Sequence, residues 1–411
     1  YDISLGLVGS EMCIRDRYTA MNKLFSYALV ASIGLLFIAP LSSCNHSEVT
    51  ISDDEQRDKA YQEIAETFVN KTVVPTYTKM AQKTVDLVED LRAYRKAPTQ
   101  ENLNKACEDF IESRGWWERS EAFLFGAAND FGIDPHIDSW PLDLPALQKY
   151  LEEATNIKEL DGEDSDIVAR TKLGQELLGF HGVEYILFEN GKPRTAGTIS
   201  EEHLIYAIAV AGDLRNSCWQ LLTAWAGEEY ASKLNKELVK HILEDVELPV
   251  LVGGRFSYGE NMVKAGQPGS LYRSWINAME DIVSGCNGIC DEVGTSKIGK
   301  AHTGEDASYI ESPYSQRSIL DFHDNITSVE NVYLGGIEGN RGASLHQYMQ
   351  THNKAMDAKV LKAIDNAKNA IKSMKAPFVL NYTDAGCKTA MDACKALDET
   401  LSELKQELAK K

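Results

Sequence analysis

Apolar residues that recur every three or four positions, over segments several helical turns long, constrain the fold more than any other feature of this chain. Strand-like alternation of apolar and polar residues is scarce. The periodicity is typical of amphipathic helices that bury one face. We therefore predict an all-α fold of long antiparallel helices packed as bundles, with helices over residues 59–69, 78–94, 101–125, 165–188, 200–225, 272–293 and 356–374.

Proline and glycine mark the expected helix ends, at Pro75, 96–98, 135–145, 191–193, 253–254, 335–336 and 375–377. The tripeptide Lys-Ala-Pro occurs twice among these breaks, and each copy joins one expected helix to another. Such a short match is weak evidence for duplication. It fits two bundle-like domains, 54–240 and 241–411, divided before the glycine-rich stretch 251–269.

The first 43 residues are expected to be absent from the mature fold. Part of the segment 1–20 resembles a translated sequencing adapter, so we treat this segment as non-native. Residues 21–43 have a single basic residue, Lys23, before an apolar run, 24–39, that is too short for a comfortable membrane span. We expect residues 21–43 to be a signal peptide.

This signal ends in Leu41-Ser42-Ser43-Cys44, which resembles a bacterial lipobox. In a lipobox the small residues admit the signal peptidase, and the cysteine thiol takes a diacylglyceryl group. We therefore expect Cys44 to be lipidated and to anchor the protein to a bacterial membrane, facing the periplasm or the outside. An ordinary signal peptide is the alternative. Residues 44–53 would form a polar tether between lipid and domain.

The net charge of −20 belongs to the mature part, because basic and acidic side chains balance within residues 1–43. Such a charge argues against nucleic acid as a partner. It also disfavours anionic lipid surfaces. The expected membrane contact is therefore the acyl chain on Cys44 and not a basic patch.

Six cysteines follow Cys44, and disulfides are allowed outside the cytoplasm. Two pairs are close in sequence, Cys286 with Cys290 and Cys387 with Cys394. A bridge inside a regular helix would be strained, so free buried thiols are an equal alternative. No Cys-x-x-Cys spacing occurs, which argues against a structural zinc site.

The segment Gly179-Phe180-His181-Gly182-Val183-Glu184 places a histidine and a carboxylate three residues apart in an apolar stretch. On a helix this spacing points both side chains to one face, and the glycines leave room for close approach of a backbone or ligand. The same His-x-x-Glu spacing recurs at 241–244, in a charged run, and at 302–305, in a polar loop. Because an unpaired buried charge is costly, two interpretations stay open. His181 and Glu184 neutralise each other in the core, or they bind a metal ion or another ligand.

The pattern Gly-x-His-x-x-Glu resembles the hallmark of the imelysin-like family, bacterial envelope proteins known as insulin-cleaving metallopeptidases and linked to iron uptake. Three further segments resemble the family's aromatic helix, the loop after it and, less specifically, its carboxy-terminal landmark: 114–123, 137–141 and 312–335. The resemblance extends over residues 54–410. It implies an all-helical protein of two bundle-like domains, with a cleft between them that is lined by the helix carrying His181.

The resemblance makes His181 and Glu184 candidate ligands for iron or zinc, which imidazole and carboxylate donors suit better than calcium. Glu118 and Glu121, three apart on the aromatic helix, would supply further oxygens if that helix packs against 179–188. A solvated carboxylate is the alternative for Glu118. The remaining candidates for the cleft walls are Trp116 and Trp117 from the first domain, and Tyr314, Ser315 and Asp324 from the second.

The function that these residues favour is capture of iron, an iron complex or haem in the cleft for uptake, with a transporter that the sequence does not identify. A zinc- or iron-dependent metallopeptidase is the alternative. No histidine is followed directly by glutamate, so the His-Glu-x-x-His arrangement is absent and no catalytic residue is assigned. An envelope scaffold or polysaccharide-binding component is a second alternative.

Overall fold

The all-α fold predicted from the sequence is confirmed. A computed structural model describes residues 52–251 and 256–410. In these ranges the only strands are β1 (Phe188–Glu189) and β2 (Lys192–Pro193), which pair as a short antiparallel hairpin. The expected signal peptide, the lipidated Cys44 and the break at 253–254 lie outside the described residues.

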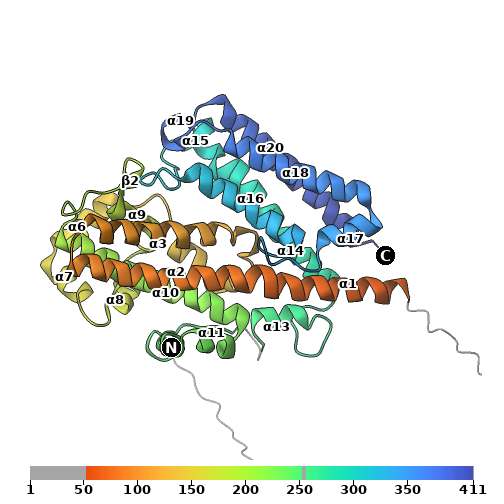
Figure 1. Cartoon of the computed structure of the whole chain (residues 1–411), viewed down its shortest axis with the longest axis horizontal. Helices are drawn as coiled ribbons and strands as arrows, with labels where there is room; N and C mark the ends of the chain where they lie inside the picture. Colours follow the sequence, from red (N-terminus) through yellow and green to blue (C-terminus); the bar gives the residue numbers. More distant parts are fainter. Residues whose placement is uncertain (1–51, 252–255, 411) are drawn as a thin grey trace, which may run out of the picture. The chain divides into compact units, whose positions relative to one another are not determined.

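Three long helices of the first half pack along one another: α2 (Val74–Lys96), α3 (Gln100–Glu118) and α10 (Glu201–Ala226) (Figure 1). Helices α2 and α3 each bury an apolar stripe, whereas α10 is buried on nearly all sides, and α2 contacts both of the others. Before them lies α1 (Asp53–Thr67), which Ser52 caps by exchanging hydrogen bonds with Glu55. The helix thus begins at the end of the segment expected to be a tether.

Pro75 does not end a helix, contrary to the prediction. It lies in the first turn of α2, directly after a π-helical turn at Phe68–Val73 that connects α2 to α1. Proline lacks an N–H group, and the first turn of a helix is where this loss is tolerated. The chain therefore stays helical through this position.

Short helices fill the segment between α3 and α10. They are α4 (Ala127–Asp130), α5 (Ile133–Ile137), α6 (Leu144–Glu152), α7 (Ala154–Leu160), α8 (Ser165–Lys172) and α9 (Gly179–Leu187). The single helix predicted over 165–188 is wrong, because a 3-10 turn at Gln175–Leu177 separates α8 from α9. Gly179, with a φ of +73°, adopts a left-handed conformation that a continuous α-helix does not contain.

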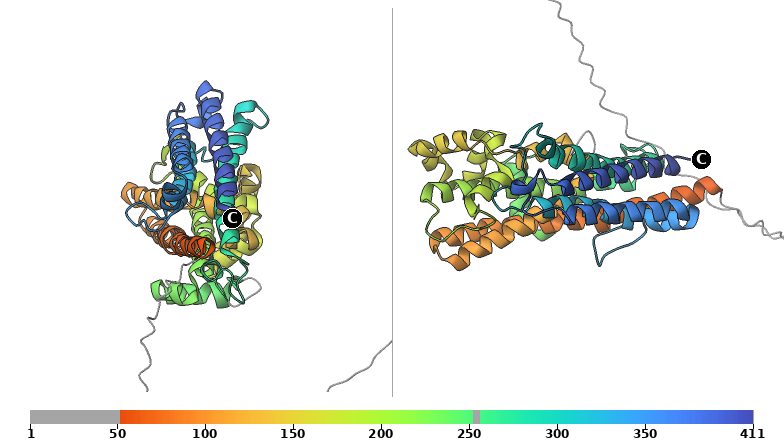
Figure 2. Two further views of the ribbon diagram at one scale, coloured as in Figure 1. Left: turned by 90° about the vertical axis from the view of Figure 1, so that its right-hand side faces the viewer. Right: turned by 90° about the horizontal axis from the view of Figure 1, so that it is seen from above.

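The long helices of the second half are α14 (Trp275–Glu292), α16 (Ser318–Leu334), α18 (Lys354–Lys372) and α20 (Ala385–Leu408). In both views of Figure 2, α18 and α20 lie side by side, and α14 and α16 pack against this pair. The shorter elements are α11 (Glu228–Leu234), α12 (Lys236–Lys240), α13 (Tyr258–Val263), α15 (Gly299–Thr303), α17 (Leu345–His352), α19 (Phe378–Asn381), and π-helical turns at His241–Asp245 and Val293–Lys297.

Helices α16 and α20 lie outside the helices expected from the sequence, although α20 has a regular buried stripe. Its buried positions include Cys387, Ala390, Cys394, Leu397 and Leu401, at the three- and four-residue spacing of a helix. Cysteine and alanine occupy the first half of the stripe, and they give a weaker apolar signal than leucine or isoleucine. All six cysteines after Cys44 are free and buried, as one of the two alternatives expected.

Elements from the two halves of the chain touch one another. Helix α16 packs against α3, and α14 packs against α1 and against a 3-10 turn at Glu121–Phe123. The described residues, 52–251 and 256–410, belong to one compact unit. The domain boundary near residue 240 and the cleft between domains stay predictions. Among the described residues, each helix is too short or too polar to cross a lipid bilayer.

Candidate functional site

Two glycines allow α9 to approach its neighbours closely. A Cβ atom on Gly179 would lie 1.9 Å from the carbonyl oxygen of Ile137, in α5. A Cβ atom on Gly182 would lie 2.3 Å from the hydroxyl of Tyr206, in α10. Both distances are far below van der Waals contact. The glycines of the motif are therefore required for packing, and they bring His181 next to the loop that follows α5.

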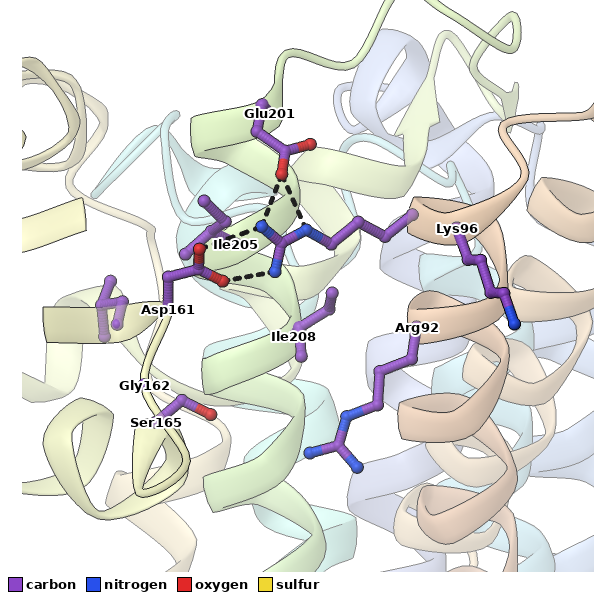
Figure 3. Close-up of a pocket in the computed structure, with 10 residues that line it drawn as sticks. Arg92, Lys96, Asp161, Gly162, Ser165, Glu201, Ile205 and Ile208 are labelled. Atoms are coloured by element: carbon purple, nitrogen blue, oxygen red, sulfur yellow. Dashed lines mark hydrogen bonds and ion pairs between the residues drawn. The ribbon is translucent and has the colours of Figure 1, made fainter. Parts of the chain in front are cut away.

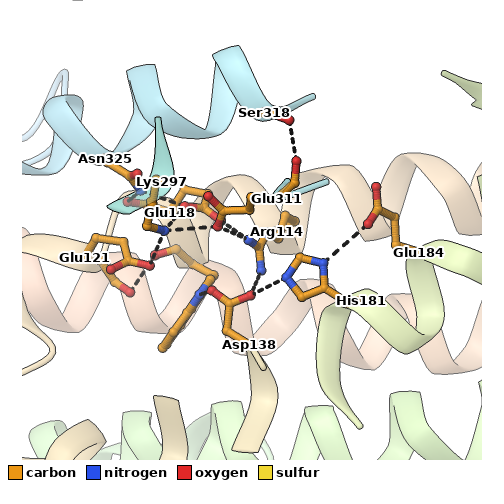
Figure 4. A network of polar contacts seen from close by, with 12 residues as sticks. Arg114, Glu118, Glu121, Asp138, His181, Glu184, Lys297, Glu311, Ser318 and Asn325 are labelled. Atoms are coloured by element: carbon orange, nitrogen blue, oxygen red, sulfur yellow. Dashed lines mark hydrogen bonds and ion pairs between the residues drawn. The ribbon is translucent and has the colours of Figure 1, made fainter. Parts of the chain in front are cut away.

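His181 and Glu184 lie on one face of α9, as predicted, and both are buried. His181 Nδ1 is 3.4 Å from Glu184 Oε2. The other ring nitrogen, Nε2, is 3.0 Å from Oδ1 of Asp138 (Figure 4). Asp138 belongs to the family-like loop 137–141, but it is not among the site residues expected from the sequence. A polar residue within that family-like loop was the available signal.

Asp138 is held from two more directions by α3. Arg114 Nη1 forms an ion pair with Oδ1, and the indole N–H of Trp117 donates to Oδ2 at 2.7 Å. The Arg114 guanidinium also contacts Glu118 Oε1 at 2.5 Å and Glu311 Oε1 at 2.6 Å. Arg114 thus links three carboxylates that are far apart in the sequence.

Lys297, from the π-helical turn after α14, enters the same cluster and is 2% exposed. Its Nζ atom is 3.0 Å from Glu311 Oε1, 3.5 Å from Glu121 Oε1 and 3.8 Å from Glu118 Oε2. Asn325, in α16, donates to Glu118 Oε2 at 2.6 Å. Neither Lys297 nor Glu311 is predicted from the sequence, because nothing local distinguishes them from the many other charged residues.

The second half of the chain also holds Glu184. The backbone N–H of Ser315 donates to Glu184 Oε1 at 2.8 Å, and the Ser315 hydroxyl donates to the same oxygen at 2.6 Å. The hydroxyl of Ser318 donates to the carbonyl oxygen of Glu311. We call the connected side chains the buried polar network: Arg114, Glu118, Glu121, Asp138, His181, Glu184, Lys297 and Glu311.

The pKa values in the network follow from burial and from these contacts. Burial alone would lower the pKa of His181, but its bonds to Asp138 and Glu184 raise it to about 9. Burial alone would raise the pKa of Asp138, but Arg114 and His181 hold it well below its usual range. Both groups are therefore charged at neutral pH, and the pair resembles an internal salt bridge.

The glutamates behave differently. Burial raises the pKa of Glu118 to about 7 despite the neighbouring Arg114, and burial also raises the pKa values of Glu121 and Glu311. Five carboxyl groups face only three basic side chains in the network. The excess carboxylates favour either bound protons or an additional cation.

The donor atoms fit a metal ion in kind and spacing. Oxygen or nitrogen atoms of Asp138, His181 and Glu311 all lie within 4.8 Å of one another, and so do those of Glu118, Glu121 and Asp138. Glu311 Oε2 and Glu118 Oε1 have no aligned hydrogen-bond donor among the described residues. Arg114 contacts Asp138 and Glu311, so an ion and the guanidinium would compete for the same carboxylates.

Some of the other predicted site residues lie in surroundings that differ from those expected. Glu118 is fully buried and not solvated, and α3 ends at this residue, so Glu121 lies in the next turn and not on the same helix. Trp117 is buried in the network. Trp116 instead lies at a hollow of about 760 Å³ with Asp324, which pairs with Arg119 at 3.0 Å.

Tyr314 lies beside the network and not in it. It is half-buried, and its ring packs against Tyr185, the residue after Glu184. The two other His-x-x-Glu copies are elsewhere. His241 contacts Asp166 at 2.8 Å, and His302, which lies in α15 and not in a loop, bonds to the carbonyl oxygen of Tyr382 at 2.8 Å.

Comparison with known proteins identifies one family over most of the chain. The sequence pattern of the Imelysin family matches residues 73–404. The chain is 27% identical over 340 residues to iron-regulated protein A of Synechococcus elongatus, covering 81% of this chain and 83% of that protein.

Two solved structures are similar. A putative iron-regulated protein A precursor from Parabacteroides distasonis aligns with a TM-score of 0.71 at 28% identity, covering 86% of this chain and 96% of that one. An imelysin-like protein from Psychrobacter arcticum aligns with a TM-score of 0.53 at 12% identity, covering 85% of this chain and 93% of that one. The second likeness concerns the fold alone.

Proposed function

Because this chain belongs to the imelysin family, we propose that it is an exported, lipid-anchored protein that binds iron as a divalent ion in the buried polar network. Similar proteins are named as iron-regulated, which supports an iron-related role. The observation that carries the proposal is the triad of Asp138, His181 and Glu311, whose donor atoms lie within 4.8 Å of one another.

The chemistry of the triad supports iron over calcium or magnesium. One imidazole nitrogen with carboxylate oxygens is a donor set that suits iron and zinc, whereas calcium and magnesium prefer oxygen ligands alone. Iron is the cargo in this proposal. The triad would bind it with release of the His181 Nε2 proton, while Glu184 would keep the ring oriented through Nδ1, as carboxylates do behind metal-binding histidines.

Burial favours a bare ion over a larger ligand. His181, Glu184 and Glu311 are at most 2% exposed, so haem or a bulky iron complex would have to displace several packed elements. The same closure argues against a metallopeptidase, because an extended polypeptide would have to reach side chains that the protein covers completely. We therefore place binding ahead of peptide hydrolysis.

Calorimetric titration tests the site. We expect the wild type to bind Fe²⁺ under anaerobic conditions, with Zn²⁺ as a second probe, and His181→Ala to bind each ion at least tenfold more weakly. His302→Ala is the matched control, because it removes a histidine from the same His-x-x-Glu spacing outside the network, and its affinity should be unchanged. Identical isotherms for wild type and His181→Ala would contradict the assignment, provided that circular dichroism shows both folded.

The lipid anchor is tested separately. Expression of the full chain in a bacterium fed radiolabelled palmitate should label the wild type but not Cys44→Ser. The wild type should be recovered with membranes, and the variant in the soluble fraction. Equal labelling of both proteins would contradict lipidation at Cys44 and would leave the metal proposal unaffected.

A further inference from the structure

A pocket of about 450 Å³ lies apart from the buried polar network, between the end of α2, the turn that joins α7 to α8, and the first turns of α10 (Figure 3). It shares no lining residue with the network. Its volume lies in the range of small-molecule sites. We propose that this pocket binds a small organic phosphate, with the phosphate group near Arg92 and Ser165 and the carbon skeleton against an apolar wall.

The basic side chains come from one face of α2. Arg95 lies three positions and Lys96 four positions after Arg92, so both lie on the side of α2 that carries Arg92, and all three line the pocket. Cations are also favourable in the last turn of a helix for reasons of stability alone. Whether these cations mark a site therefore depends on which of them are paired within the protein.

Arg95 uses its donors within the protein. It bonds to both carboxylate oxygens of Asp161 and, through Nε at 2.7 Å, to Glu201. Asp161 and Glu201 are the two acidic residues that line the pocket, and one guanidinium binds both of them. Arg92 and Lys96 form no hydrogen bond or ion pair within the described residues, and Figure 3 shows both without such a partner.

Ser165 gives an independent indication of a ligand. The residue is only 7% exposed, it lines the pocket, and its hydroxyl has no hydrogen-bond partner in the described part of the chain. It is also the first residue of α8, whose N-cap Asp164 makes no side-chain hydrogen bond to the helix. Backbone N–H groups at such a helix start, together with a nearby hydroxyl, bind phosphate oxygens well.

An apolar wall completes the pocket. Leu160, Ile205 and Ile208 line it and are at least 92% buried by their neighbours, at 1%, 4% and 8% exposure. Only a small part of this wall is exposed to the pocket. An organic phosphate with a compact apolar part would cover that part, which a free phosphate ion would leave in water, and the small burial would add modestly to the affinity.

Calorimetry with phenyl phosphate, inorganic phosphate and phenylacetate tests the proposal on the full chain. The wild type should bind phenyl phosphate most tightly, at least threefold more tightly than inorganic phosphate, because only phenyl phosphate has both the oxyanion and the apolar part. Phenylacetate bound as tightly as phenyl phosphate would overturn the assignment of phosphate, and so would absence of phenyl phosphate binding at millimolar concentration.

Two charge-reversed variants provide the control. Arg92→Glu should weaken phenyl phosphate binding at least tenfold, whereas Lys362→Glu makes the same change of net charge on the exposed face of α18 and should bind like the wild type. Both positions are exposed, so neither change should disturb folding. Equal affinities in the two variants would attribute binding to overall charge and would sink the proposed site. Iron binding should be unchanged in both, so this test is independent of the metal proposal.

Discussion

His181 Nε2 lies 3.0 Å from Asp138 Oδ1, although 43 positions separate the two residues in the sequence. Asp138 also accepts from Trp117 and pairs with Arg114. Three elements, α3, the loop after α5 and α9, are therefore joined at one carboxylate. Removing the charge of Asp138 would leave the buried positive charges of Arg114 and His181 less well neutralised.

The first prediction is that Asp138→Asn lowers the free energy of unfolding by about 3–5 kcal/mol at pH 7, as expected when one partner of a buried ion pair is lost. Urea denaturation measures this value. The exposed Asp164→Asn, in the N-cap of α8, should change it by less than about 0.5 kcal/mol. NMR titration of the variant should also show the pKa of His181 well below about 9. An unchanged pKa would show that Asp138 is not the partner that holds the proton.

The second prediction concerns Gly179. A side chain there meets the carbonyl oxygen of Ile137 and requires a φ of +73°. We expect Gly179→Ala to lower the free energy of unfolding by about 3 kcal/mol. About 1–2 kcal/mol would come from the left-handed backbone conformation and about 1–3 kcal/mol from overpacking. Gly288→Ala, in α14 with open space around the added atom, should instead gain about 0.5–1 kcal/mol. Thermal unfolding compares the two. Equal effects would mean that close packing does not explain the motif glycine.

The sequence predicted the helical class and the position of the motif, because both depend on neighbours a few residues apart. The apolar period persists through Leu173, Leu177 and Leu178, which is why the break between α8 and α9 was missed. The partners of His181 were harder to predict. Arg114 and Glu311 are 197 positions apart yet in contact, and no local pattern records such a pairing.

The glycines of the Gly-x-His-x-x-Glu motif have a structural role that the sequence only suggests. Gly179 is needed because the backbone of α5 lies against it, and Gly182 leaves room for the hydroxyl group of Tyr206, in α10. The expected Glu184 interaction with His181 is present, but the carboxylate closest to the ring is Asp138. A buried charged residue outside the motif could be identified only from the folded arrangement.

The third prediction concerns Lys297, which is surrounded by Glu118, Glu121 and Glu311. Lys297→Met leaves these carboxyl groups with only Arg114 as a fixed counter-charge. We expect this variant to lower the free energy of unfolding by about 3–5 kcal/mol at pH 8. The decrease should be smaller at pH 5, where the carboxyl groups can take up protons in the folded state. Raised pKa values in the folded state make stability fall as the pH rises. Lys362→Met, on an exposed surface, should show the same small change at both pH values, and a pH-independent loss in Lys297→Met would contradict the electrostatic explanation.

The fourth prediction uses a carboxyl group outside the network. Burial and a hydrogen bond with Asp90 raise the pKa of Asp109 to about 6 from the usual 3.8, although Lys83 Nζ, 3.0 Å away, acts in the opposite direction. Because the folded-state pKa is the higher one, the stability that Asp109 contributes through its proton is complete below about pH 4 and is lost as the pH rises through 6. The stability of the wild type relative to Asp109→Asn should therefore fall between pH 4 and pH 7 in urea denaturation.

Asp86→Asn is the control for Asp109→Asn. Asp86 also pairs with Lys83, at 3.3 Å, but its side chain is 50% exposed. The substitution therefore removes a carboxylate from the same lysine without changing a buried group. Water screens such an exposed pair, and its contribution should be small at every pH. The difference between wild type and Asp86→Asn should accordingly stay nearly constant from pH 4 to pH 7. A decline of equal size in both variants would mean that the lysine, and not the buried Asp109 carboxyl group, governs the pH dependence at this contact between α2 and α3.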